Sequence, residues 1–207
     1  MKFYKLDIKK KIIFLVMIPI FIIIAVILGR KIVIPTNDEI INELKNTKMY
    51  TCNVEYTFIN ARDNFKENTK QYYRYDKGGR IEFDDYYRRI KIYNGEEIKL
   101  QIAGKDYRLN KNIDSIYPLS FIENILSYSI SEPIEELNEE WGEGEYLKLN
   151  IDYGNDNRYL KTGEFYIDKN KRIPVALKVY DQFGNERILI KYNNFKYEKI
   201  ISAGLFE

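Results

Sequence analysis

The first 34 residues have the most uneven hydrophobic pattern of the chain. The 17 residues from Ile12 to Leu28 carry no charge, and five lysines precede them. As a helix this run would be about 26 Å long, slightly short of the ~30 Å hydrocarbon core of a bilayer. We predict a transmembrane signal-anchor over residues 12–34, preceded by a short basic cytoplasmic segment, residues 1–11. Because lysines favour the cytoplasmic side, we expect a single-pass protein whose main domain is extracytoplasmic.

A cleavable signal peptide is the alternative for this segment. Its apolar region is usually 7–15 residues long and ends in a site of small residues. Here the run is longer, and a cut after Gly29 would place Ile27 at the −3 position. A lipoprotein would need a cysteine just beyond the apolar run, whereas Cys52 lies far downstream. The pattern therefore favours an uncleaved anchor.

Beyond Pro35 the pattern changes from helical to strand-like. Thr36 and Glu39 have the spacing of a capping box, which predicts a short helix with Ile40, Ile41 and Leu44 on one face. From Tyr50 to Phe58 the even positions are apolar and the odd positions polar, a pattern that predicts a half-buried strand. Cys52 lies on the apolar face, so we expect a buried core thiol rather than a reactive one.

Similar alternation recurs along the rest of the chain. Asn94-Gly95 predicts a hairpin turn, and Asp181 to Asn185 predicts another turn. A second helix is predicted from Leu119 to about Tyr128. It carries an apolar stripe at helical spacing: Leu119, Ile122, Ile125 and Leu126.

These elements predict one domain over residues 36–207, of the α+β class. Its strands form a long antiparallel meander that is apolar on one face only. Because a one-faced sheet would expose its core, we expect both helices to pack across the concave side, with the Leu119 helix filling it.

Composition argues against several functions. The residues after position 34 have a net charge of −4, which does not suit nucleic-acid binding. The chain has no histidine, so it has no Ser-His-Asp triad and no His-ligated zinc. With no Gly-rich phosphate loop either, we expect a non-enzymatic protein without a metal or cofactor.

The acidic segment Glu132–Glu145 surrounds Trp141, the only tryptophan of the chain. Two interpretations stay open for it. Trp141 with Glu139 and Glu140 fits a partner-binding site, because tryptophan is enriched at interface hot spots and acidic rims steer basic partners. The favoured alternative is that Trp141 anchors a long loop onto the sheet while the glutamates keep the loop soluble.

The order of several motifs resembles a known family. The motifs are YTCNVEY, KQYYRYDKGGRIEF, RRIKIYNGEEI, IDSIYPLSFIENIL and FYIDKNKRIPVALKVYDQFGNERILIKYNNF, closing in GLF. Over residues 38–206 they resemble the germination lipoprotein GerS and its relatives in clostridia, within the LolA-like superfamily.

That resemblance implies a strongly curved half-barrel and a role in spore germination, in spore or forespore membranes. The implied function is that of a non-enzymatic partner of the amidase that modifies cortex peptidoglycan. This chain departs from the lipid-anchored family type, so a paralogue with another client stays open. The alternative is a carrier or sensor of an apolar ligand, a lipid or lipoprotein acyl chain, inside the half-barrel.

Overall fold

The computed structural model describes residues 15, 17–26, 35–60, 62–154 and 157–207. The chain separates into two compact units, residues 1–39 and residues 40–207. In the first unit residues 17–26 are helical. The predicted capping box is confirmed, because the Thr36 N–H donates to Glu39 Oε2 at 2.8 Å and the Glu39 N–H donates to Thr36 Oγ1 at 3.2 Å.

The predicted basic segment, residues 1–11, and most of the predicted anchor, residues 12–34, lie outside the described residues. Among the helices that the structure describes, none is long and apolar enough to cross a membrane. The anchor stays a prediction from the sequence.

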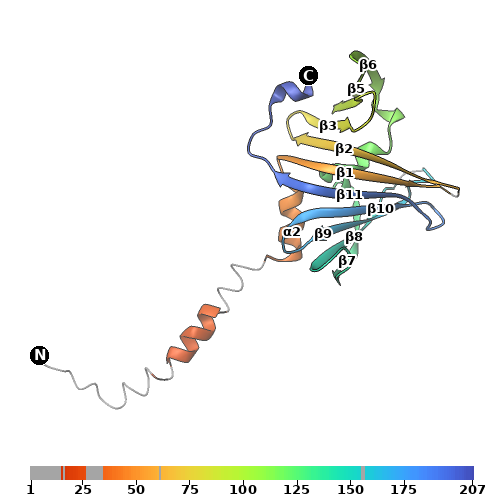
Figure 1. Cartoon of the computed structure of the whole chain (residues 1–207). Helices are drawn as coiled ribbons and strands as arrows, with labels where there is room; N and C mark the ends of the chain where they lie inside the picture. Colours follow the sequence, from red (N-terminus) through yellow and green to blue (C-terminus); the bar gives the residue numbers. More distant parts are fainter. Residues whose placement is uncertain (1–14, 16, 27–34, 61, 155–156) are drawn as a thin grey trace, which may run out of the picture. The chain divides into compact units, whose positions relative to one another are not determined.

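One antiparallel sheet of eleven strands forms the second unit, and it is open and curved (Figure 1). Across the sheet the strands follow the order β6-β5-β4-β3-β2-β1-β11-β10-β9-β8-β7. The strands are β1 (Met49–Ile59), β2 (Asn64–Arg74), β3 (Gly78–Phe83), β4 (Ile90–Asn94), β5 (Glu97–Ile102), β6 (Lys105–Asn110), β7 (Ser129–Asn138), β8 (Glu145–Asp152), β9 (Thr162–Asp168), β10 (Ile173–Tyr180) and β11 (Glu186–Tyr197). The predicted meander is therefore confirmed, in two halves that meet where β1 pairs with β11.

The chain crosses the whole sheet between β6 and β7, because these two strands are its opposite edges. The connection, residues 111–128, is called the crossing segment here. It contains three short helices: η1 (Lys111–Ile113), η2 (Tyr117–Ser120) and α3 (Ile122–Ile125). Its apolar side chains share one core cluster with the inward side chains of the sheet and with α2 (Asn37–Lys45). The topology thus places the crossing segment over the apolar face of the sheet.

Strand β1 shows how the alternating pattern becomes the core. Tyr50, Cys52, Val54 and Tyr56 are at most 2% exposed, and the residues between them are partly or fully exposed. Burial raises the pKa of the Cys52 thiol, which keeps it protonated. The prediction of a buried core thiol is confirmed.

The predicted helix from Leu119 to Tyr128 is wrong in its extent. Phe121 is extended, with φ −78° and ψ 129°, so it separates η2 from α3. Two sheet side chains hold this break: the Tyr192 hydroxyl donates to the Ser120 carbonyl at 2.8 Å, and Tyr50 accepts the Ile122 N–H at 3.2 Å. Backbone groups that bond to the sheet cannot continue a helical ladder.

The acidic segment also differs from the predicted long loop. Its first part belongs to strand β7, where Ile130, Ile134 and Leu137 are half-buried. The pairing of β7 with β8 shifts between Ser131 and Glu135. That irregularity breaks the period-2 pattern and explains why the strand was missed. Only residues 139–144 form the turn between the two strands.

Candidate functional site

A groove of about 470 Å³ opens where β1 ends and β2 begins. We call it the end groove. Eight of its ten lining residues are apolar or aromatic, a composition typical of binding clefts. The lining residues are Phe58, Ile59, Asn60, Phe65, Ile116, Tyr117, Tyr159, Leu160, Arg187 and Ile188.

The end groove lies where the apolar face of the sheet extends past the core. Phe58 and Phe65 are directly opposite each other on β1 and β2, and their rings stack with centroids 5.7 Å apart. Phe65 and Tyr159 are 55% and 54% exposed, while Leu160 is buried. The groove therefore has an apolar base and two accessible aromatic side chains.

Arg187 provides a fixed positive charge in the lining. Its Nε donates to Asp181 Oδ2 at 2.8 Å, and its Nη2 lies 2.6 Å from the same oxygen. Although burial opposes ionisation of Asp181, hydrogen bonds from Asn185, Phe183 and Arg187 hold the pKa of this carboxyl well below its usual range. The ion pair therefore keeps its geometry at neutral pH.

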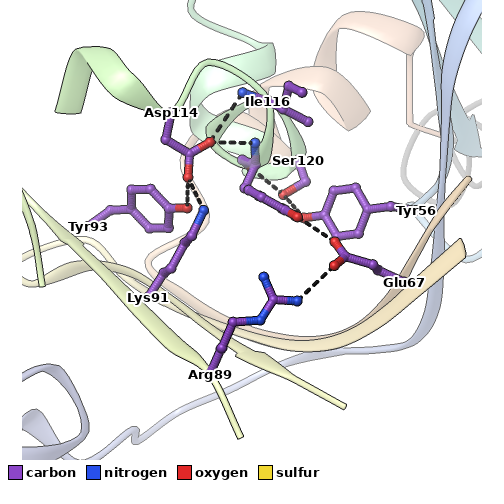
Figure 2. Close-up of polar contacts among 9 residues, drawn as sticks. Tyr56, Glu67, Arg89, Lys91, Tyr93, Asp114, Ile116 and Ser120 are labelled. Atoms are coloured by element: carbon purple, nitrogen blue, oxygen red, sulfur yellow. Dashed lines mark hydrogen bonds and ion pairs between the residues drawn. The ribbon is translucent and has the colours of Figure 1, made fainter. Parts of the chain in front are cut away.

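A cluster of polar contacts holds Tyr117, one wall of the groove, against the sheet, and Figure 2 labels its partners Glu67 and Asp114. Glu67 on β2 accepts the Tyr117 hydroxyl and also the Arg89 guanidinium, whose Nη2 is 2.8 Å away. Asp85 binds Arg89 Nε from the other side. Burial, followed by the bond to Glu67, raises the pKa of Tyr117, so this phenol remains a proton donor.

Asp114 forms the second half of the cluster (Figure 2). Its Oδ2 accepts from Lys91 Nζ at 2.6 Å and from the Tyr93 hydroxyl at 2.8 Å. Its Oδ1 accepts the backbone N–H groups of Ile116 and Tyr117, both at 3.3 Å. One carboxylate thus fixes the turn into η2 and joins it to β4.

Deeper in the core, Ser120 connects the crossing segment to β1 and β2. The Tyr56 hydroxyl donates to Ser120 Oγ at 2.7 Å, and the Gln71 side-chain amide donates to Tyr56 at 2.8 Å and to Ser120. Gln71 and Ser120 are both fully buried. Buried polar groups with complete partners specify one arrangement, so the crossing segment is a fixed part of the core and not a mobile cover.

These carboxylates are poorly suited to acid–base chemistry. Glu67 and Asp114 are each engaged by one cation and one phenol. In the described part of the chain, no group of three or more His, Cys, Asp or Glu residues is placed to hold a metal ion. The arrangement provides a rigid apolar groove with a polar frame.

The four predicted residues of the second helix lie in the core. Leu119, Ile122, Ile125 and Leu126 are at most 5% exposed and belong to the cluster that includes the inward side chains of the sheet. The structure brings them together with α2, as expected for side chains that cover the apolar face.

Trp141, Glu139 and Glu140 lie on the turn between β7 and β8 and do not line the end groove. The Trp141 ring packs edge-on against Tyr166, with centroids 5.2 Å apart, and Lys178 Nζ lies 5.2 Å from its centroid. Glu140 lies 3.5 Å from the same lysine. These contacts agree with the anchoring interpretation. The partner-binding role of the three residues stays a prediction.

The family is shown by a match over nearly the whole chain. Residues 9–206 match the model of the family described as sporulation protein YdcC-like. The chain belongs to the YdcC-like family of sporulation proteins. For this YdcC-like chain, the predicted link to sporulation is confirmed, and the narrower assignment to GerS stays a prediction. No curated protein matches the chain.

Solved structures resemble the YdcC-like chain in fold. An uncharacterized conserved protein from Thermus thermophilus has a TM-score of 0.54 at 14% identity, covering 82% of this chain and 92% of its own. A LolA superfamily protein from Nitrosomonas europaea has a TM-score of 0.49 at 8% identity, covering 84% and 98%. A chain in the structure of the CwlD amidase from Clostridioides difficile in complex with the GerS lipoprotein has a TM-score of 0.47 at 19% identity, covering 79% and 97%. The first likeness speaks for the fold alone, and we draw no conclusion from the other two.

The residues of the end groove were missed from the sequence. They come from three strands, two loops and the crossing segment, and neighbouring walls are separated by many residues along the chain. One local signal was available. Phe65 follows a polar stretch and continues the inward face of β2, so an aromatic residue at a strand end marked an apolar surface beyond the core.

Proposed function

We propose that this YdcC-like protein is a non-enzymatic binding protein of the sporulation pathway that captures a protein partner in its end groove. A cortex peptidoglycan amidase is the proposed partner, on the basis of the sequence resemblance to GerS relatives. The N-terminal segment would hold the protein to a membrane, with the sheet domain outside the cytoplasm. The observation that supports the proposal is burial in a shared core: Leu119, Phe121, Ile122, Ile125 and Leu126 are at most 5% exposed and belong to one cluster with the inward side chains of the sheet.

With these side chains buried in the core, the end groove is an accessible apolar site among the described residues. Its rim offers Phe65 and Tyr159, and its lining includes Arg187. Aromatic residues and arginine are the side chains enriched in interface hot spots, where they combine apolar contact with hydrogen bonding. The rigid frame around Tyr117 adds affinity, because a wall that is already ordered loses little conformational entropy on binding.

A carrier or sensor of an apolar ligand is the second candidate. The volume and apolar lining of the end groove favour it, since a space of about 470 Å³ lies within the range of small-molecule sites. Such sites enclose most of the ligand surface. The end groove is open at its rim, where Phe65 and Tyr159 are half-exposed. An acyl chain would therefore stay partly exposed in it, whereas one or two side chains of a protein would fit.

Site-specific photo-crosslinking in sporulating cells tests the proposal. A benzophenone amino acid replaces Phe65 or Tyr159 in the full chain, and Tyr75 or Ile200, which are 61% and 85% exposed away from the groove, in matched controls. We expect adducts to the cortex amidase from the groove positions and not from the controls. Adducts to lipid alone would support the carrier instead, and equal amidase adducts from all four positions would contradict a role for the groove.

A fifth probe position tests the other predicted contact. The same photo-reactive residue at Glu140 reports whether the Trp141 turn meets the partner. Amidase adducts from Glu140 would assign the turn to the interface, whereas their absence would leave Trp141 as an anchor of its own loop.

A further inference from the structure

The two edges of the sheet differ in their readiness to pair with another strand. One edge of the sheet is β6, next to β5 (Figure 1). The two strands pair without a register shift, from Ile102 opposite Lys105 to Glu97 opposite Asn110. On the other edge, β7 contains Pro133, which has no N–H group, and its register shifts nearby. Edge strands that are regular and uncovered are templates for pairing with another chain, so β6 is the competent edge.

The turn before β6 determines which backbone groups point away from the sheet. Ala103 and Gly104 have φ values of 47° and 78° and form a two-residue hairpin turn. Such a turn closes with a hydrogen bond from the Lys105 N–H to the Ile102 carbonyl. Because bonding alternates along an antiparallel strand, Lys105, Tyr107 and Leu109 bond to β5. The N–H and C=O groups of the alternate residues, Asp106, Arg108 and Asn110, therefore point outward.

We propose that β6 is a self-association edge, on which a second copy of this chain pairs its own β6 antiparallel around a two-fold axis at Tyr107. In an antiparallel pair, the residues whose backbone N–H and C=O groups point away from β5 must lie opposite the same kind of residue in the second copy. The symmetric registers that pair at least three strand residues are then centred on Asp106, Tyr107, Arg108 or Leu109, and the last pairs Arg108 with Asn110 over three residues only. The registers centred on Asp106 and Arg108 place two aspartates or two arginines face to face. Only the register centred on Tyr107 places Asp106 opposite Arg108 of the second copy, and it does so twice.

Neighbouring charges agree with this register. Asp106 lies 3.1 Å from Lys99 Nζ, and Arg108 Nη1 lies 3.6 Å from Glu97, both on β5. In the paired sheet these side chains would form a row of alternating charge across four strands. Opposite charges directly across two strands are stabilising and like charges are destabilising. The row therefore favours the register centred on Tyr107 over those centred on Asp106 and Arg108, which oppose like charges.

The other face of the strand adds an aromatic contact. Tyr107 is 46% exposed. On the axis it faces Tyr107 of the second copy as a non-hydrogen-bonded pair, in which side chains approach most closely. A two-fold interface is self-complementary, so each residue contact occurs twice. The result is a continuous sheet across both copies.

A cysteine at the axis tests the geometry directly, because only a residue on a two-fold axis meets its own copy. The variants are Tyr107→Cys, Lys105→Cys and Asn110→Cys in the full chain, whose own Cys52 is 2% exposed. Cells producing each variant are oxidised with copper phenanthroline and analysed on non-reducing gels. We expect about tenfold more disulfide-linked dimer from Tyr107→Cys, since the off-axis cysteines are too far apart for a disulfide.

The charge pairing is tested in the Tyr107→Cys background. Adding Arg108→Asp places like charges opposite each other and should lower the dimer yield severalfold. Adding Asp106→Arg to that variant restores the pairs with reversed sign and should restore the yield. Dimer from Tyr107→Cys no more abundant than from Lys105→Cys would overturn the proposal. A dimer yield that Arg108→Asp does not lower, or that adding Asp106→Arg does not restore, would also overturn it.

Discussion

The Tyr117 hydroxyl donates to Glu67 Oε2, and this contact joins the crossing segment to strand β2 at the wall of the end groove. Glu67 also receives Arg89, and its side chain is only 12% exposed. The wall is therefore held by a charge-assisted bond in a largely dry place, where such bonds are stronger than at the surface.

Removing that hydroxyl should weaken the domain measurably. We expect Tyr117→Phe to lower the free energy of unfolding by about 1 kcal/mol, because the net worth of a hydrogen bond is of that size and Glu67 keeps Arg89 as a partner. Urea denaturation measures the change. Tyr86→Phe, at a position 93% exposed, is the matched control and should have no effect. Equal stability of both variants would contradict the role given to Tyr117.

Glu123 on α3 should make the stability of the domain depend on pH. Burial raises the pKa of its carboxyl to about 8, and its Oε2 has no hydrogen-bond partner among the described residues. Between the unfolded pKa near 4.3 and about 8, folding takes up a proton at this site, so stability falls as pH rises through that window. Above it, both states are ionised and the loss levels off.

The variant Glu123→Gln removes this dependence. Its free energy of unfolding should exceed that of the wild type by an amount that grows from pH 5 to pH 8 and reaches on the order of 1–3 kcal/mol. Urea titrations at pH 5, 7 and 9 measure the difference. Glu143→Gln, on the exposed β7–β8 turn, is the control. A difference that is constant with pH would rule out a proton taken up at Glu123.

Gly79 lets the crossing segment approach the sheet closely. A Cβ atom on this residue would lie 2.3 to 2.8 Å from the ring carbons of Phe121, which is 1% exposed. We expect Gly79→Ala to destabilise the domain by about 1–3 kcal/mol, the usual range for overpacking. Adding Phe121→Leu should recover part of the loss in a thermal or urea melt. Gly204→Ala, whose nearest neighbour would be 3.7 Å away, is the control, and a loss equal to that of Gly79→Ala would contradict the contact.

Asp181 should account for much of the stability of the β10–β11 turn. It is 3% exposed and accepts the N–H groups of Phe183 at 2.8 Å and Asn185 at 2.9 Å, besides Arg187. We expect Asp181→Asn to cost about 1.5–3 kcal/mol at pH 7, because the charged bonds are lost. Since the folded pKa is lowered, the advantage of the wild type holds above pH 4 and declines as pH falls further.

An exposed carboxylate serves as the comparison for that measurement. Asp84→Asn, at an exposed position, should change the stability little at any pH. Unfolding curves of the two variants at pH 3, 5 and 7 separate the outcomes. Equal losses for Asp84→Asn and Asp181→Asn would remove the special role of the buried turn.

Local chemistry made the strands, two turns and the first helix predictable. The alternation from Tyr50 to Phe58, the Asn94-Gly95 turn and the Thr36–Glu39 capping box each depend on residues within a few positions of one another. The antiparallel, curved α+β architecture followed from these signals and from the family resemblance.

The rest could not be predicted because it depends on contacts between distant residues. Tyr117 reaches Glu67, and Asp114 reaches Lys91, only because the chain crosses from one sheet edge to the other after β6. The same crossing splits the predicted second helix, since its backbone is held by Tyr50 and Tyr192 from the sheet. A periodic pattern reports a buried face, and it does not report which partner covers that face.

The pairing of β1 with β11 has a consequence for how the chain folds during translation. Residues 49–59 are made well before their partners in residues 186–197. The hairpins from β1 to β6 can form as they appear, because each strand pairs with its neighbour in sequence. Until residues 186–197 have been made, however, β1 has an unpaired edge that any extended peptide nearby can pair with, and such edges promote aggregation. Nascent chains that stall before residue 186 should therefore be the aggregation-prone species of this protein.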